Sequence, residues 1–152
     1  MRSTFKISYL LSFVSAAVAG CSLFLHGPYA WLFVAYSFAF IPAFELFFKG
    51  DASSFSDKEA ESLKHQPIYD YLLYAIFYVQ WSLVLLFFWR LSIEGPSADT
   101  VARIFTLGFT CGVFEINVAH ELGHRTNAFA QFYARGLLLS SLYMHFTIEH
   151  NK

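Results

Sequence analysis

The sequence predicts an all-α integral membrane protein, in which four transmembrane helices are followed by one interfacial helix. Of its 152 residues, 57% are hydrophobic and only 14% are charged, and the mean hydropathy is +0.47. Soluble globular domains have about 45–50% apolar and about 25% charged residues, so this composition excludes them. The second observation is a series of four apolar runs, each close to the roughly 20 residues that a membrane-spanning helix needs.

The predicted spans are separated by segments that interrupt membrane helices. His26-Gly27-Pro28 follows the first apolar run, the polar loop 49–66 follows the second, and Glu94-Gly95-Pro96 ends the third. Glycine and proline mark turns between helices, and a charged loop belongs in water rather than in lipid. These boundaries place the four spans at residues 7–25, 29–48, 68–93 and 101–119.

A further helix is predicted at 132–148, and we expect it to lie in the membrane interface or against the bundle. Polar residues interrupt it and leave too short an apolar run for a span: Arg135, Ser140, Ser141 and His145. Basic residues favour a cytoplasmic N-terminus, because one orientation collects most of them inside: Arg2, Lys6, Lys49, Lys58, Lys64 and Arg125. The fourth span and the interfacial helix then also end on the cytoplasmic side.

Charge and cysteine content exclude other classes of function. The net charge of −1 provides no basic face for phosphates, so we expect no nucleic-acid partner. Only two cysteines are present, Cys21 and Cys111, which is too few for a cysteine-rich zinc site or a disulfide framework.

The strongest functional signal lies at the end of the fourth span. His120 and His124 are one helical turn apart, so both imidazoles project from the same face. A single histidine here would be interpreted as an interfacial polar residue with a hydrogen-bond partner. Two histidines with Glu121 between them favour a metal site, since imidazole binds zinc and iron alike.

One interpretation of this segment is a membrane zinc metallopeptidase. His120-Glu121-Leu122-Gly123-His124 matches H-E-x-x-H, in which two histidines hold zinc and the glutamate is the general base. The same residues resemble the motif of intramembrane site-2 proteases. That chemistry needs a further Asp or Glu ligand on a later element, which the sequence does not visibly supply.

The other interpretation uses a second histidine-containing segment as well. Asn117-Val118-Ala119-His120-Glu121-Leu122-Gly123-His124-Arg125, followed by His145-Phe146-Thr147-Ile148-Glu149-His150-Asn151-Lys152, closely resembles the integral-membrane alkane hydroxylases (alkane 1-monooxygenases) of the fatty-acid-desaturase-like di-iron superfamily. Their first box, H-E-L-G-H-[KR], is followed by G-H-F-x-I-E-H-N-[KR]-G-H-H. Met144 stands where glycine is usual. The zinc peptidases do not account for the second segment.

The resemblance implies a six-helix fold in the bacterial inner membrane, with two non-haem iron ions. It implies hydroxylation of the terminal carbon of a medium-chain alkane, an apolar substrate, with O₂ and electrons from rubredoxin. Related fatty-acid or xylene hydroxylases and desaturases share the superfamily and remain alternatives. The family's further histidines and two later spans are absent from these 152 residues. We therefore expect an N-terminal portion that is inactive alone.

Carried over by motif, the iron ligands are His120, His124 and His150. Glu121 and Glu149 are expected to orient imidazoles rather than to bind iron. For Asn117, a hydrogen bond to a histidine ring and simple capping of polar neighbours are equally supported.

The helix that leads to the histidines suggests a path for an apolar substrate. At 100° per residue, four apolar side chains project within roughly 40° of His120: Ala102, Phe109, Val113 and Ile116. We expect this stripe to border a substrate channel, although a helix-packing face is an equally good interpretation. Glu45 and Glu115 are interpreted as interfacial residues.

Overall fold

The computed structural model describes residues 3–47, 67–146 and 149. All regular secondary structure in this part of the chain is helical, which confirms the predicted all-α class. In chain order the elements are α1 (Ser3–Phe24), η1 (Gly27–Trp31), α2 (Leu32–Ala35), η2 (Tyr36–Phe40), α3 (Ile41–Phe47), α5 (Pro67–Glu94), α6 (Ala98–Thr110), η3 (Cys111–Ile116), α7 (Asn117–Gly123) and α8 (Ala128–Ser140).

Three helical stretches are long and apolar enough to cross a membrane. They are Gly27–Phe47, Ile68–Glu94 and Ala98–Gly123, with 21, 27 and 26 residues. Their bounds agree closely with the second, third and fourth predicted spans, except that the last continues past residue 119 to Gly123 and so includes His120. In α1 the apolar helical stretch is the shorter Ser12–Phe24.

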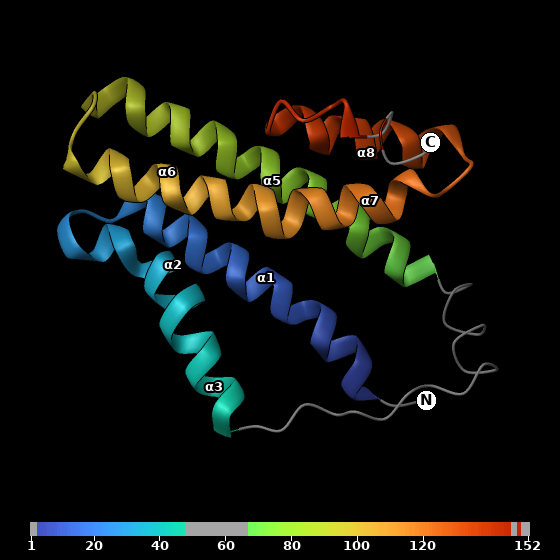
Figure 1. Ribbon diagram of the computed structural model, residues 1–152, viewed down its shortest axis with the longest axis horizontal. Coiled ribbons are helices and arrows are strands. Elements are labelled where there is room, and N and C mark those ends of the chain that lie inside the picture. Colours follow the sequence, from blue (N-terminus) through green and yellow to red (C-terminus); the bar gives the residue numbers. More distant parts are fainter. Residues whose placement is uncertain (1–2, 48–66, 147–148, 150–152) are drawn as a thin grey trace.

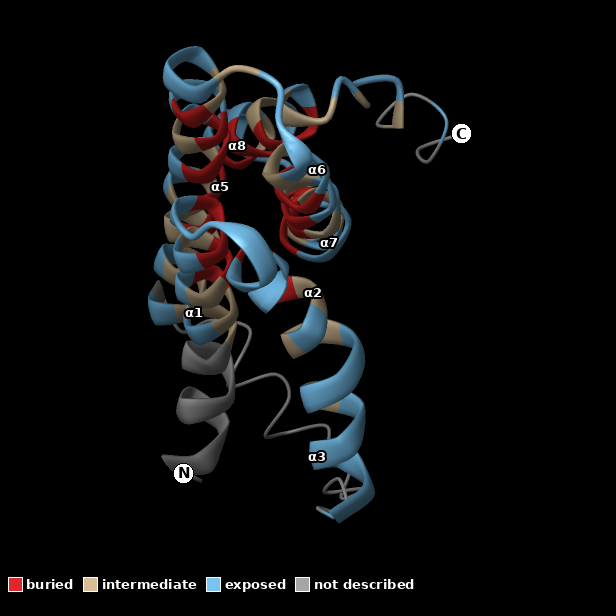
Figure 2. Ribbon diagram, turned by 90° about the vertical axis from the view of Figure 1, so that its left-hand side faces the viewer, coloured by how far each residue is buried: buried red, intermediate tan, exposed pale blue. Residues whose placement is uncertain are grey.

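The helices form a bundle in which the chain direction alternates (Figure 1). α1, α5 and α8 run in one direction, and α6, η3 and α7 join into a single rod that runs the opposite way. The starts of α1 and α5 therefore lie at the same end of the bundle as the end of α7. α2 and α3 diverge from α1, and Figure 2 shows α3 exposed along its length.

Buried side chains concentrate where α5, the α6–α7 rod and α8 face one another (Figure 2). Small and branched residues dominate the cluster between α7 and α8: Ala119, Leu122, Ala130, Tyr133, Ala134, Leu137 and Leu138. The alanines let the two helix backbones approach closely, as in other membrane bundles. This cluster lies directly beside the turn that carries His120.

A group of charged residues closes the opposite end of the bundle. Arg103 Nη1 donates to Glu94 Oε2 at 2.6 Å, and Arg90 also pairs with Glu94. Arg90 Nη2 lies 2.7 Å from His26 Nε2, and His26 Nδ1 lies 3.2 Å from Asp99 Oδ2. Because Arg103 is only 2% exposed, this pairing is what makes its charge tolerable inside the bundle.

The predicted bounds of the last helix, 132–148, are wrong at both ends. α8 begins earlier because Asn127 caps it, with Oδ1 accepting the Ala130 N–H at 2.6 Å. It ends at Ser140 because Leu142 adopts a left-handed φ of 61°. The N–H of Tyr143 then donates to Leu138 O at 2.8 Å, and that of Leu142 to Leu139 O at 3.1 Å. These bonds form a Schellman motif, which stops the helix and reverses the chain.

Replacing Asn127 with alanine should lower the free energy of unfolding by about 1 kcal/mol, because the Ala130 N–H loses its side-chain acceptor. Unfolding in mixed detergent micelles would measure the change. Asn127→Asp is the matched control, since it retains an acceptor oxygen and should stay close to the unsubstituted protein. Equal losses in the two variants would contradict a capping role.

Candidate functional site

The centre of the candidate site is the pair of imidazoles of His120 and His124, called here the histidine pair. Their Nε2 atoms lie 3.0 Å apart and their ring centroids 4.6 Å apart. Two nitrogens bound to one ion at about 2.1 Å and about 90° also lie roughly 3 Å apart. The rings thus converge as their spacing along the helix predicts, and their geometry fits two ligands of one metal ion.

The described residues supply only part of a ligand set. Within them, no group of three His, Cys, Asp or Glu side chains is placed so that it could hold a metal ion. The third predicted ligand, His150, lies outside the described residues. The assignment of all three as metal ligands stays a prediction.

The chain reversal after α8 directs the second histidine-containing segment back toward the first. Tyr143 and Phe146 pack against the cluster between α7 and α8. The Phe146 ring stands edge-on to His120, with ring centroids 6.2 Å apart. Glu149 is exposed, and its N–H donates to His145 O at 3.2 Å. Residues 143–146, called here the return segment, therefore lead toward the histidine pair.

Contacts made by Arg125 and Gln131 anchor the turn that follows His124. Arg125 pairs with Asp70 near the start of α5, and its Nη2 lies 3.6 Å from Glu121 Oε1. Partial burial lowers the pKa of Arg125, but the hydrogen bond and charge of Asp70 outweigh it, so this pKa lies above its ordinary value. Gln131 Nε2 donates to Gly123 O at 2.7 Å and to Arg125 O at 2.8 Å, which satisfies carbonyls left unpaired at the helix end.

Sequence reasoning missed both Asp70 and Gln131. Their partners are distant in sequence or are backbone atoms, so neither residue belongs to a recognisable local pattern. Glu121 was expected to orient an imidazole, and the partner that the structure gives its carboxylate is Arg125. For Asn117, the structure gives a hydrogen bond from Nδ2 to Val113 O at 2.9 Å, which is a local backbone contact.

The predicted apolar stripe does not form a single face. The π-helical turn η3 holds one more residue per turn than an α-helix, so it rotates α7 by about 100° relative to α6. Ala102 is fully buried and Phe109 packs against the cluster of α1, α2 and α5, whereas Val113 is 55% exposed. Val113 and Ile116 lie within η3 itself and are the residues of the stripe nearest to His120 along the rod.

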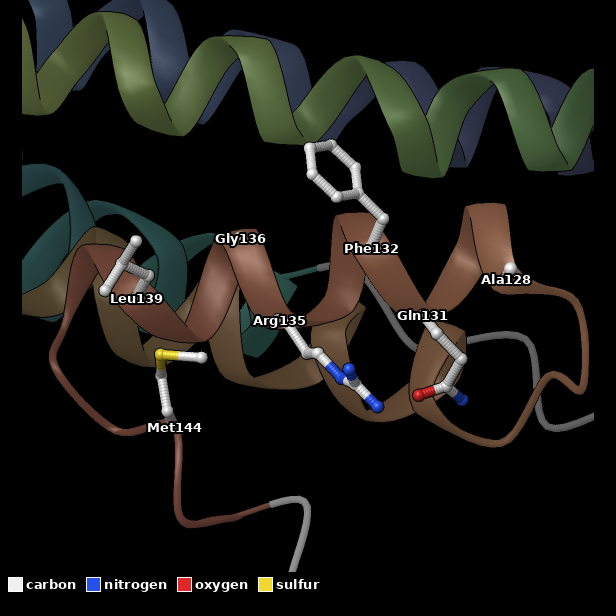
Figure 3. Close-up of a pocket in the computed structure, with 7 residues that line it drawn as sticks. All are labelled: Ala128, Gln131, Phe132, Arg135, Gly136, Leu139 and Met144. Carbon is white, nitrogen blue, oxygen red and sulfur yellow. The ribbon is translucent and has the colours of Figure 1, made fainter.

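A groove of about 460 Å³ lies along the outer side of α8 (Figure 3). Two polar residues and five apolar ones line it: Gln131 and Arg135, and Ala128, Phe132, Gly136, Leu139 and Met144. Figure 3 shows the Arg135 side chain extending toward Gln131, with Leu139 near the end of the helix and Met144 close to it on the segment that follows. None of the predicted channel residues lines this groove, so it is not the predicted channel.

Glu115, which the sequence suggested as an interfacial residue, has contacts that the sequence did not predict. Its side chain is fully buried and accepts hydrogen bonds from Ser140 and Ser141 at the end of α8. No periodic pattern links a residue of the fourth span to serines some 25 positions later.

Three curated relatives carry the name predicted from the motifs. The chain is 27% identical to alkane 1-monooxygenase of Pseudomonas putida, over 97% of this chain and 38% of the relative. It is 25% identical to alkane 1-monooxygenase 1 of Alcanivorax borkumensis, over 95% and 37%, and 26% identical to alkane 1-monooxygenase of Ectopseudomonas oleovorans, over 74% and 28%. No protein-family model matches the sequence.

The chain thus spans less than two fifths of the length of these relatives. Nearly all of it takes part in the two longer alignments, including the histidine-bearing helix and the spans before it. The resemblance to alkane 1-monooxygenases that the two histidine-containing segments predict is confirmed.

Proposed function

We propose that this chain carries part of the iron site of a membrane-bound non-haem di-iron monooxygenase. Its reaction is hydroxylation of the terminal carbon of medium-chain alkanes, with O₂ and electrons from rubredoxin. The observation that carries the proposal is the convergence of two imidazole nitrogens to 3.0 Å, at the end of a membrane-length helix. The names of the relatives support alkane 1-monooxygenation as the reaction.

His120, His124 and His150 hold iron in this proposal, and Glu121 and Glu149 orient imidazoles around it. Bound iron supplies the oxidation of an unactivated C–H bond, which amino-acid side chains cannot perform. The chain's own contribution is positional. α7 fixes the two rings, and the Arg125–Asp70 pair and Gln131 hold the turn that follows them.

The surroundings of the site suit a substrate from the bilayer. Four spans in a six-helix fold, with α1 as the first, place the N-terminus and the histidine pair on the cytoplasmic side of the bacterial inner membrane. Rubredoxin, a soluble electron donor, reaches the site from there, while the alkane enters from the lipid. Ile116 and Val113 lie about one and two turns before His120 and are the residues of the predicted channel nearest to it on this route.

Metal binding tests the proposal. We expect the chain in lipid nanodiscs to bind Fe(II), and Co(II) as its spectroscopic substitute. His120→Ala and His124→Ala should each weaken Co(II) binding by about tenfold or more, because each removes one of few ligands. His26→Ala is the matched control, since that histidine lies at the opposite end of the bundle and should leave Co(II) affinity unchanged.

Equal Co(II) affinity in all three variants would overturn the assignment of the histidine pair. The zinc metallopeptidase would be favoured instead by two results together. The chain would keep one zinc ion per molecule in the presence of Fe(II), and it would cleave a membrane peptide in a reaction that is lost when Glu121 is replaced. Iron binding without peptide cleavage supports the monooxygenase.

A further inference from the structure

A carboxylate is buried inside a helix that is long and apolar enough to cross the membrane. Glu115 lies in η3, within the stretch Ala98–Gly123, and none of its surface is exposed. An ionisable residue at this position is costly unless polar groups surround it, and it is therefore a candidate for a specific role. Its role must be found in its contacts, since its position on the helix does not bring it to the histidine pair.

Both oxygens of Glu115 accept hydrogen bonds from the end of α8. Ser140 Oγ donates to Oε2 at 2.7 Å, and Ser141 Oγ donates to Oε1. On the same turn, the sulfur of Cys111 accepts a hydrogen bond from the Gln80 amide at 3.2 Å. We call the three residues Glu115, Ser140 and Ser141 the carboxylate–serine contact. It joins the rod that carries the histidine pair to the last turn of α8.

The carboxylate–serine contact sits at the point where the chain reverses. Ser140 is the last residue of α8, Ser141 is its C-cap, and Leu142 follows with a φ of 61°. Leucine rarely adopts this left-handed conformation, which glycine normally occupies in a Schellman motif. A leucine held there needs surrounding contacts that determine the turn, and hydrogen bonds to both preceding serines provide them.

The direction of the return segment depends on this turn. Tyr143 donates its N–H back to Leu138 O, and Phe146 donates its own to Tyr143 O at 3.2 Å. Phe146 then meets the ring of His120. Displacing the end of α8 from the rod would therefore move the whole segment that precedes the predicted ligand His150.

We propose that Glu115 is a positioning residue, which sets the approach of the second histidine-containing segment to the histidine pair by fixing the chain reversal after α8. This approach matters for metal binding only if the histidine pair holds a metal ion, so the inference rests on the proposed function. The hydrogen bonds of Glu115 lead to Ser140 and Ser141, so its effect on metal binding passes through these serines and the return segment.

Amide hydrogen exchange and Co(II) affinity test this proposal together. Glu115→Gln keeps the size of the side chain, but its amide nitrogen cannot accept a hydroxyl proton, so one serine loses its acceptor. We expect faster exchange over residues 142–146, unchanged exchange over 128–137, and Co(II) affinity lowered by about tenfold. The double variant Ser140→Ala, Ser141→Ala should give the same changes. Combining it with Glu115→Gln should change the exchange rates and the Co(II) affinity little further.

Two controls separate positioning from general destabilisation. Arg103→Met removes an ion pair at the opposite end of the bundle, so it should lower stability without faster exchange confined to 142–146. Ser82→Ala removes an exposed serine hydroxyl that donates only to its own helix, and should leave both measurements unchanged.

Unchanged exchange over 142–146 in folded Glu115→Gln would overturn the proposal. So would faster exchange with unaltered His120-dependent Co(II) binding, because the reversal would then not govern the metal site. If the unsubstituted chain shows no His120-dependent Co(II) binding, the proposed function fails, and the exchange measurement alone decides whether Glu115 holds the reversal.

Discussion

Replacing Arg103 with methionine should lower the free energy of unfolding by about 2–3 kcal/mol. Arg103 is 2% exposed, and its guanidinium donates to Glu94 Oε2 at 2.6 Å and to Leu25 O at 3.2 Å. Removing one partner of a buried ion pair leaves the other charge and a carbonyl without their donors. We expect less than the roughly 3–5 kcal/mol typical of a fully buried pair, because the Glu94 side chain is 23% exposed and keeps Arg90 as a partner. In addition, Arg103 Nε is itself buried without a hydrogen-bond partner.

Reversible unfolding in mixed detergent micelles would measure this loss. Arg135→Met is the matched control, because Arg135 is exposed on α8 and has no ion pair among the described residues. That variant should stay within about 0.5 kcal/mol of the unsubstituted protein. If the two arginine variants unfold alike, the group of charged residues at this end does not stabilise the bundle.

The predictable part of the fold depends on composition and local spacing. Apolar runs predict membrane helices, because every residue of a span contributes to the free energy of transferring the helix from water into lipid. The histidine pair was likewise predictable, because His120 and His124 meet through the geometry of one helical turn. These features need no knowledge of neighbouring helices.

Features that depend on packing were not predictable. The π turn between Cys111 and Ile116 leaves no mark in the hydropathy pattern, yet it separates Ala102 and Phe109 from the face of His120. The end of α8 was placed too late because Leu142 is not the glycine that such a turn usually contains. The chain reversal also depends on hydrogen bonds to Glu115, a residue on another helix, so it could not be inferred from residues 140–148 alone.

Replacing Gly136 with alanine should lower the free energy of unfolding by about 2 kcal/mol. A Cβ at this position would lie 2.5 Å from Cε2 of Phe77, which no normal contact permits. The Phe77 ring has little room to move away, because other aromatic rings surround it. Its centroid lies 4.9 Å from that of Tyr133 and 6.4 Å from that of Trp81. Trp81 Nε1 also donates to Gly136 O at 3.1 Å, so α8 cannot move away without weakening that bond.

Gly108→Ala supplies the comparison, because Gly108 is also helical but nothing lies within 4 Å of the Cβ it would gain. Alanine there should be neutral, or stabilising by up to about 1 kcal/mol through its higher helix propensity. Opposite signs in the two variants would show that Gly136 is required for close approach of α8 to α5. Equal stabilisation would mean that the Phe77 ring yields freely. The position of α8, and with it the turn that directs the return segment toward the histidine pair, would then be less constrained than these contacts indicate.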